Sequence, residues 1–273
     1  MNSFEFGIIA PAFVASLLVL ATHVPLGTEV LRRGIIFIDL AIAQVAGLGV
    51  IAADTMGWEA EGWMVQIAAV TAALLAALVL HWTDRRYPDI QEALIGVAFI
   101  LAATIGILLL AGNPHGGEHL KELLVGQILW VNFEQLLPAA IVSALILVAW
   151  FWMRDRLQGF GFYAVFAFAV TVSVQLVGIY MVFACLIIPA LATRRIVRRR
   201  PRLISGYAVG VVGCLLGLML TINADLPAGA VIVLSLAVVA LLFALLVKPI
   251  IGRTRWSALD SKSRVYEEHP PDV

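Results

Sequence analysis

Long apolar stretches alternate with short polar ones along almost the whole chain. Each of the eight apolar segments has about the 20 residues that a ~30 Å hydrocarbon core requires, or more. Because lipid offers no partner to backbone amides, each segment predicts a helix, and the short alternating strands of a membrane barrel are absent. The pattern predicts an all-α, polytopic transmembrane helical bundle of about 8–9 spans. The apolar segments are residues 7–25, 35–53, 62–82, 92–112, 135–153, 161–191, 203–222 and 226–249.

The segment 161–191 is too long for one simple crossing. Its 31 residues carry no charge, and one helix of that length would extend about 47 Å at 1.5 Å per residue. A turn near Gly178 would let the chain cross and return, since glycine tolerates the backbone angles of a tight turn, and Pro189 allows a second break. One steeply tilted helix is the alternative, but it would place the arginines that follow on the opposite side of the membrane.

Basic residues gather between the apolar segments in a way that fixes the orientation. All but one of the 18 Lys and Arg residues, Lys121 being the exception, lie in regions that a nine-crossing chain brings to one side. The positive-inside bias makes that side cytoplasmic, so we expect the N-terminus outside and the C-terminus inside. Residues 1–252 form the predicted transmembrane domain and 253–273 a polar cytoplasmic tail. The basic clusters are Arg32/Arg33, Arg85/Arg86, Arg154/Arg156, residues 194–202 and the tail from Lys248.

Composition supports a protein of the cell (inner) membrane. The chain is 62% hydrophobic and only 13% charged, with a mean hydropathy of +0.99, whereas a soluble domain carries roughly a quarter charged residues. Its net charge of zero gives no indication of a nucleic-acid partner. The two cysteines, Cys185 and Cys214, stand in apolar runs and are interpreted as small core residues. The first six residues carry no basic cluster, so we expect no cleaved signal peptide.

The motifs of soluble and intramembrane enzymes are missing. The sequence contains no phosphate-binding loop, no zinc-protease helix, no nucleophile elbow and no haem-attachment motif. We therefore expect no catalytic residues and no cofactor, and any ATP hydrolysis would reside on a separate subunit.

Ionisable and polar residues inside spans are costly and hence functional candidates. Asp39 lies near the start of the second apolar segment, with Gln44 deeper in it and about 140° around the helix. Both are candidates for a translocation path. Alternatively, Asp39 caps the helix or pairs with Arg32 or Arg33 near the cytoplasmic surface, and Gln44 makes an interhelical hydrogen bond.

The outer loop holds the only clustered histidines. His115 and His119 stand four residues apart with Glu118 between them, a set that suits zinc or manganese, and Asp225 falls on the same side. A histidine pair in a polar loop can equally be solvated. His23 lies at the predicted cytoplasmic end of the first span, where a histidine is favourable in any case.

Four stretches resemble one family, the membrane subunits of ABC importers for zinc, manganese and iron. The family's acidic-x-x-Ile-Gly-x-x-Phe helix, its Leu-Phe-Gly-Ser-Ile-Leu stretch, its Val-Gly…Leu-Pro-Ala signature and its Leu-Pro-Ser-Gly element occur here in order. They correspond to Glu92–Phe99, Leu124–Leu129, Val177–Ala190 and Asp225–Leu234. Together they cover residues from about 30 to 245.

Two departures from the family bear on function. The second span of the family carries Asp-x-x-x-His for the metal, whereas here Leu40 and Gln44 occupy those positions and Asp39 is one residue away. The cytoplasmic link between Arg154 and Gly161 is also shorter than the family's corresponding stretch, which bears on how an ATPase docks.

The resemblance implies the permease subunit of an ATP-driven divalent-metal importer of the type II architecture. Its implied partners are an ATP-binding subunit, an extracytoplasmic metal-binding protein, a second permease subunit in a homo- or heterodimer, and membrane lipid. Three alternatives stay open: a permease for a metal chelate or other small cargo, a stand-alone secondary transporter, and a non-transporting membrane subunit.

Overall fold

The computed structural model describes residues 3–58, 62–110, 124–152, 159–224 and 226–247. Every regular element in that part of the chain is a helix, and eight helices are long and apolar enough to cross a membrane. The all-α, polytopic architecture that the apolar pattern predicts is therefore confirmed. The helices are α1 (Ser3–Arg33), α2 (Ile38–Thr55), α3 (Trp63–Arg86), α4 (Gln91–Leu110), α6 (Phe133–Trp152), α7 (Phe160–Val177), α8 (Ile179–Ala192), α9 (Arg199–Ala224) and α10 (Ala228–Leu246), with single 3₁₀ turns η1 (Pro88–Ile90) and η2 (Ile128–Trp130).

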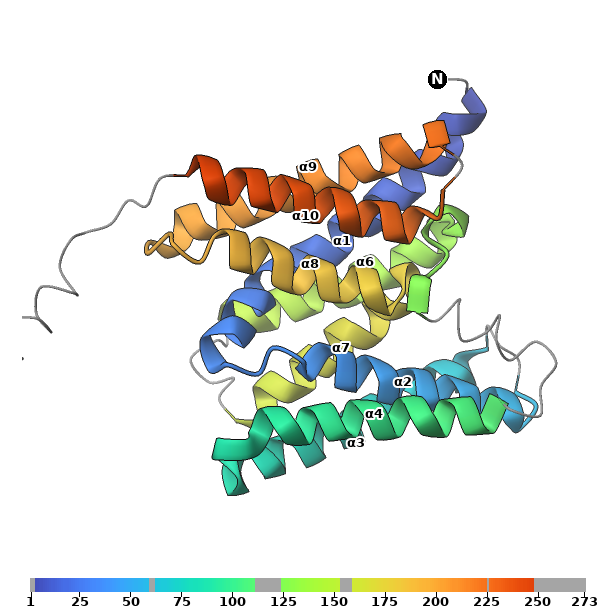
Figure 1. The fold of residues 1–273 in the computed structure, drawn as a ribbon. Helices are drawn as coiled ribbons and strands as arrows, with labels where there is room; N and C mark the ends of the chain where they lie inside the picture. The colour runs from blue at the N-terminus through green and yellow to red at the C-terminus, as the bar shows by residue number, and fades with distance from the viewer. Residues whose placement is uncertain (1–2, 59–61, 111–123, 153–158, 225, 248–273) are drawn as a thin grey trace, which may run out of the picture.

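Two groups of helices lie on either side of a central layer (Figure 1). Helix α2 packs against α3 and α4 on one side, and α9 packs against α10 on the other. Helices α1, α6, α7 and α8 lie between these groups, and α1 and α8 pack closely against each other. Of the eight long helices, α1, α2 and α7 are the most buried, whereas α3, α4, α6 and α10 expose most of their apolar surface, as lipid-facing helices do.

Helix α1 extends eight residues beyond the end of the predicted span. The chain passes through Pro25 without leaving the helix, and the Thr28 hydroxyl donates a hydrogen bond of 2.8 Å to the Pro25 carbonyl. Gly27 makes this extension possible, because a Cβ at that position would overlap the Leu186 carbonyl of α8. Helices α1 and α8 can therefore approach closely because Gly27 has no side chain.

The predicted return of the chain at Gly178 is confirmed. Helix α7 ends at Val177, Gly178 has a φ of 79°, and α8 follows for only 14 residues. The prediction of a break at Pro189 is wrong, because α8 continues through it to Ala192. The Thr193 hydroxyl and amide both donate to the Pro189 carbonyl, which secures the last turn beyond the proline.

Three contacts show that α8 returns to the end of the bundle from which α7 starts. Arg33 of α1 lies over the Phe162 ring of α7, with 3.9 Å from its guanidinium carbon to the ring centre. A Cβ on Gly159, just before α7, would lie 3.8 Å from the Arg85 guanidinium of α3. At the start of α9, Arg199 lies 5.9 Å from the Phe151 ring of α6. The described arginines therefore gather at one end, on the left in Figure 1, which the charge bias makes cytoplasmic.

Three glycines hold the outer part of the bundle together. A Cβ on Gly126 would overlap the backbone of Val177, and one on Gly178 would overlap the backbone of Gly126. A Cβ on Gly229, in the first turn of α10, would overlap the Val125 carbonyl. Val125 and Gly126 are therefore wedged between the α7–α8 turn and the start of α10.

The orientation can be tested by thiol labelling. Val197 is 91% exposed between α8 and α9, and Met56 is 71% exposed at the opposite end of α2. In intact cells, Met56→Cys should react with an impermeant maleimide and Val197→Cys should react only after permeabilisation. The opposite order would reverse the assigned topology.

Substitution of the glycine in the turn should destabilise the protein. Gly178→Ala places a side chain at a positive φ, which costs roughly 1–2 kcal/mol before the overlap with Gly126 is added. Gly96→Ala is the matched control, because nothing lies within 4 Å of its Cβ. Thermal unfolding in detergent should show a lower midpoint for Gly178→Ala only, and equal midpoints for the two variants would contradict the packing described here.

Candidate functional site

The centre of the site is Asp39, in the first turn of α2. Its side chain is buried with 1% exposure, and neither carboxylate oxygen has a hydrogen-bond partner. The ring of Phe37, two residues before it, stacks on Phe183 of α8 with 6.4 Å between ring centres. The Phe37 amide donates a hydrogen bond of 3.2 Å to Glu92 in the first turn of α4, so the start of α2 is fixed to both α8 and α4.

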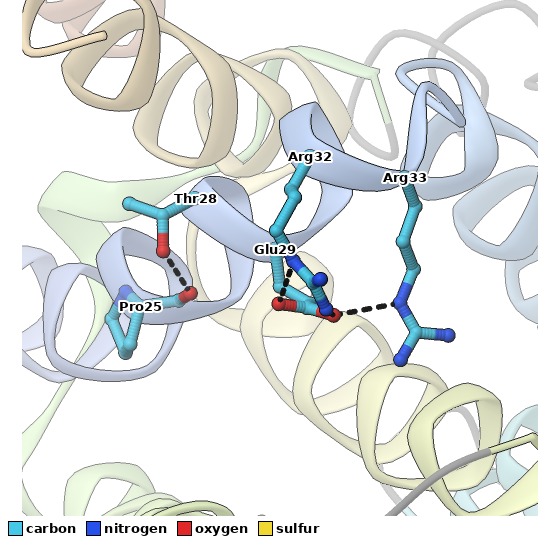
Figure 2. A network of polar contacts seen from close by, with 5 residues as sticks. All are labelled: Pro25, Thr28, Glu29, Arg32 and Arg33. Atoms are coloured by element: carbon cyan, nitrogen blue, oxygen red, sulfur yellow. Dashed lines mark hydrogen bonds and ion pairs between the residues drawn. The ribbon is translucent and has the colours of Figure 1, made fainter. Parts of the chain in front are cut away.

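The expected pairing of Asp39 with Arg32 or Arg33 is wrong. Both arginines bind Glu29 instead, one turn earlier on α1, and Arg33 does so with 2.9 Å between its Nε and a carboxylate oxygen (Figure 2). Glu29 can bind both arginines because it stands three residues before one and four before the other, on the same face of the helix. Asp39 does not cap α2 either, since Phe37 occupies the cap position.

Gln44 lies on the same helix and is also buried, with 8% exposure. Nearly every residue in the first half of α2 is buried, so both Asp39 and Gln44 face protein despite the 140° between them. The interhelical hydrogen bond of Gln44 stays a prediction.

The sequence did not identify His23 as an interior residue. It lies within α1, fully buried, ten residues before the end of the helix, so its assignment to a helix end is wrong. Its Nδ1 is 3.0 Å from both the Val19 carbonyl and the Thr22 hydroxyl, while its Nε2 has no partner. The sequence signal for an interior position was that His23 stands inside an uncharged run that ends only at Glu29, but Pro25 suggested an earlier end of the helix.

The two cysteines come together between α8 and α9. Cys185 and Cys214 are both fully buried and free, and the two thiols are neighbours. The interpretation of both cysteines as core residues agrees with their burial, but only the fold places them next to each other.

The outer-loop candidates His115, Glu118, His119 and Asp225 lie outside the described residues. Among the residues that are described, no three His, Cys, Asp or Glu side chains gather closely enough to hold a metal ion.

Comparison with known proteins places the whole chain in one family. The family model described as "ABC 3 transport family" matches residues 5–162 and 153–248. An uncharacterised membrane protein of Synechocystis, slr2045, is 28% identical over 89% of this chain and 92% of its own length. The manganese transport system membrane protein MntC of Halalkalibacterium halodurans is 25% identical over 88% and 87%, respectively. The high-affinity zinc uptake system membrane protein ZnuB of Haemophilus influenzae is 23% identical over 85% and 95%.

A solved structure shares the fold. A chain of PsaBC from Streptococcus pneumoniae, determined in complex with a Fab, superimposes with a TM-score of 0.73 at 22% identity, covering 93% of this chain and 96% of that one. The helical arrangement described above, including the short α8, is therefore found in a protein with which this chain shares little sequence.

The two ion pairs in Figure 2 predict different losses of stability when Arg32 and Arg33 are replaced. The Arg33 side chain is 25% exposed and also lies over Phe162, whereas that of Arg32 is 68% exposed. Arg33→Ala should destabilise the protein by about 1–3 kcal/mol, as expected for a partly buried charged hydrogen bond, and Arg32→Ala by less than about 1 kcal/mol. Chemical denaturation in detergent measures both, and equal losses would contradict this assignment.

Proposed function

Because the chain belongs to the ABC 3 transport family, we propose that it is the permease subunit of an ATP-driven importer of divalent metal ions, zinc or manganese. The observation that carries this proposal is the family match along almost the whole chain, together with eight membrane-spanning helices. Relatives named for manganese and for zinc transport match over most of their length and support the metal class. The protein has no catalytic role of its own, and ATP hydrolysis takes place on a separate subunit.

The permease works by alternating between two states, open outward and open inward, whose populations ATP binding shifts. An extracytoplasmic binding protein delivers the ion, and two permease subunits line the path. The outer loop captures the ion through His115, Glu118 and His119, with Asp225 on the same side. Asp39 and Gln44 then form weaker steps deeper inside, which suits a path from which the ion must also leave.

The ATP-binding subunit docks on the connection Thr193–Pro201. Thr193 is fully buried and bonded to Pro189, so this connection is fixed to the end of α8, while Val197 is 91% exposed. A movement of the docked subunit would therefore reach α8 directly. Arginines that surround Val197 would pair with acidic groups of that subunit, or alternatively with anionic lipid.

Substitution of the outer histidines tests the proposal. In cells that also produce the ATP-binding and extracytoplasmic subunits, the variant His115→Ala/His119→Ala should lower uptake of radioactive zinc or manganese at limiting metal by roughly tenfold or more. Gln44→Ala should have a smaller effect, because an amide is a weak ligand for these ions. Co-purification with the ATP-binding subunit should be the same for all variants.

Two results would change the proposal. Unchanged uptake in the double histidine variant would favour a metal chelate as cargo, a reading that Gln44 in place of the family's histidine also suits. Uptake that continues without the ATP-binding subunit would indicate a stand-alone secondary transporter.

A further inference from the structure

A cluster of six arginines stands at residues 194–202, where the chain passes from α8 into α9. The sequence carries no acidic residue after this cluster until Asp225, and the first turn of α9 has none. The amino end of a helix is the positive end of its dipole, so the arginines add to a charge that is already positive. An anionic partner would therefore stabilise this surface more than a neutral one.

Arg199 lies at the end of α6, and Arg202 is its neighbour on α9. The guanidinium carbon of Arg199 is 5.9 Å from the centre of the Phe151 ring. Arg202 follows three residues later and is half-buried, and its shielded Nε has no hydrogen-bond partner among the described residues. Guanidinium groups bind phosphate oxygens through parallel charge-assisted hydrogen bonds. The two side chains together thus offer the donors that a phosphate group requires.

Helix α6 carries an exposed apolar stripe that ends beside these arginines. Its five side chains are spaced by three or four residues, so they lie along one face of the helix, and each is more than half exposed. The last of them, Trp152, is 89% exposed and adjoins Phe151. Acyl chains cover such a stripe in a membrane, and tryptophan is enriched at the level of the lipid headgroups. The stripe consists of Leu137, Ile141, Leu145, Val148 and Trp152.

We propose that an anionic phospholipid of the cytoplasmic leaflet binds where the start of α9 meets the end of α6. Arg199 and Arg202 bind its phosphate group, and Trp152 lies at the level of its headgroup. One acyl chain extends along the α6 stripe toward the outer end of the helix. Basic positions between transmembrane helices on the cytoplasmic side bind anionic headgroups through the same combination of charge and apolar surface.

An acidic protein surface would fit these observations less well than a phospholipid. It would pair with the arginines, but it would leave the stripe uncovered, because the stripe follows α6 through the membrane. The connection around Val197, on which the ATP-binding subunit is proposed to dock, retains Arg194, Arg195 and Arg198 for that subunit. The lipid therefore holds the start of α9 at the membrane surface next to the docked subunit, whatever the cargo is.

Lipid binding to the purified full-length chain tests the site. In native mass spectrometry from a neutral detergent, the chain should bind phosphatidylglycerol more tightly than phosphatidylcholine with the same acyl chains. Arg199→Gln/Arg202→Gln should raise the dissociation constant for phosphatidylglycerol by roughly tenfold or more. The matched control Arg85→Gln/Arg86→Gln removes two exposed charges at the same end of the bundle and should leave this constant unchanged. Inorganic phosphate should not displace the lipid, because it has no acyl chain.

A photoactivatable lipid locates the acyl chain in the natural protein. Phosphatidylglycerol with a diazirine in one acyl chain, reconstituted with the chain in nanodiscs, should crosslink to peptides that contain the α6 stripe. Trp152→Ala should reduce this crosslinking. Trp82→Ala is the matched control, because Trp82 is also exposed near the cytoplasmic end, on α3, and its replacement should have no effect on the crosslink to α6.

Several results would overturn the proposal. Equal affinity for the two lipids, equal losses in the two double arginine variants, or crosslinks that avoid α6 would each exclude the site. Displacement of the lipid by inorganic phosphate would indicate a site for small anions instead. Unchanged lipid binding in Arg199→Gln/Arg202→Gln, combined with loss of the ATP-binding subunit on co-purification, would assign the arginines to that subunit.

These measurements are independent of metal transport. Their failure would leave the proposed permease function standing, and a failure of metal uptake would leave the lipid site standing. An unfolding midpoint equal to that of the natural chain establishes that each variant is folded. The crosslinking pattern of the natural chain tests the position of the lipid even if a variant does not fold.

Discussion

The backbone contact between Gly126 and Gly178 is the constraint on which the rest of the structure depends. It stops α7 at Val177 and lets α8 start in a new direction, because neither residue has a side chain to keep the two backbones apart. Without the turn, the apolar segment from Phe160 onward would be one long helix ending on the wrong side. With it, α8 returns through the bundle to the end at which α7 begins (Figure 1).

Glu29 and Asp39 are both buried, but they differ in whether their charge is compensated. Glu29 stands within reach of two arginines on its own helix, near the cytoplasmic surface, and its charge is compensated there. Asp39 lies beyond the turn that follows α1, where neither arginine reaches it. Similar side chains ten residues apart thus have different surroundings: Glu29 is paired at the end of a helix, and Asp39 is buried without a hydrogen-bond partner among the described residues.

Helix α8 connects the outer part of the bundle with the connection on which the ATP-binding subunit is proposed to dock. Gly178, just before the first residue of α8, contacts Gly126, and the last turn of α8 joins the connection on which an ATP-binding subunit would dock. Gly27 lets α1 lie directly against it, so that a displacement of α8 would be transmitted to the central layer. A short helix that is secured at both ends and buried along its length is well placed to change the surroundings of Asp39.

The hydrophobic pattern by itself determined the number of spans, their bounds to within a few residues at most ends and the return at Gly178, and the charge pattern predicts which side is cytoplasmic. These features follow from local physics, because lipid requires apolar helices, arginine stays in the cytoplasm and glycine permits the turn. Sequence also determined the family, through motifs spread over the whole chain. The partners of Asp39, the depth of His23 and the contact of Cys185 with Cys214 were decided only by the tertiary structure, because they depend on which helices pack together and in which register. Local spacing could place Glu29 next to two arginines, but it could not show that Asp39, only six residues beyond Arg33, would lie against a helix about 145 residues further along the chain.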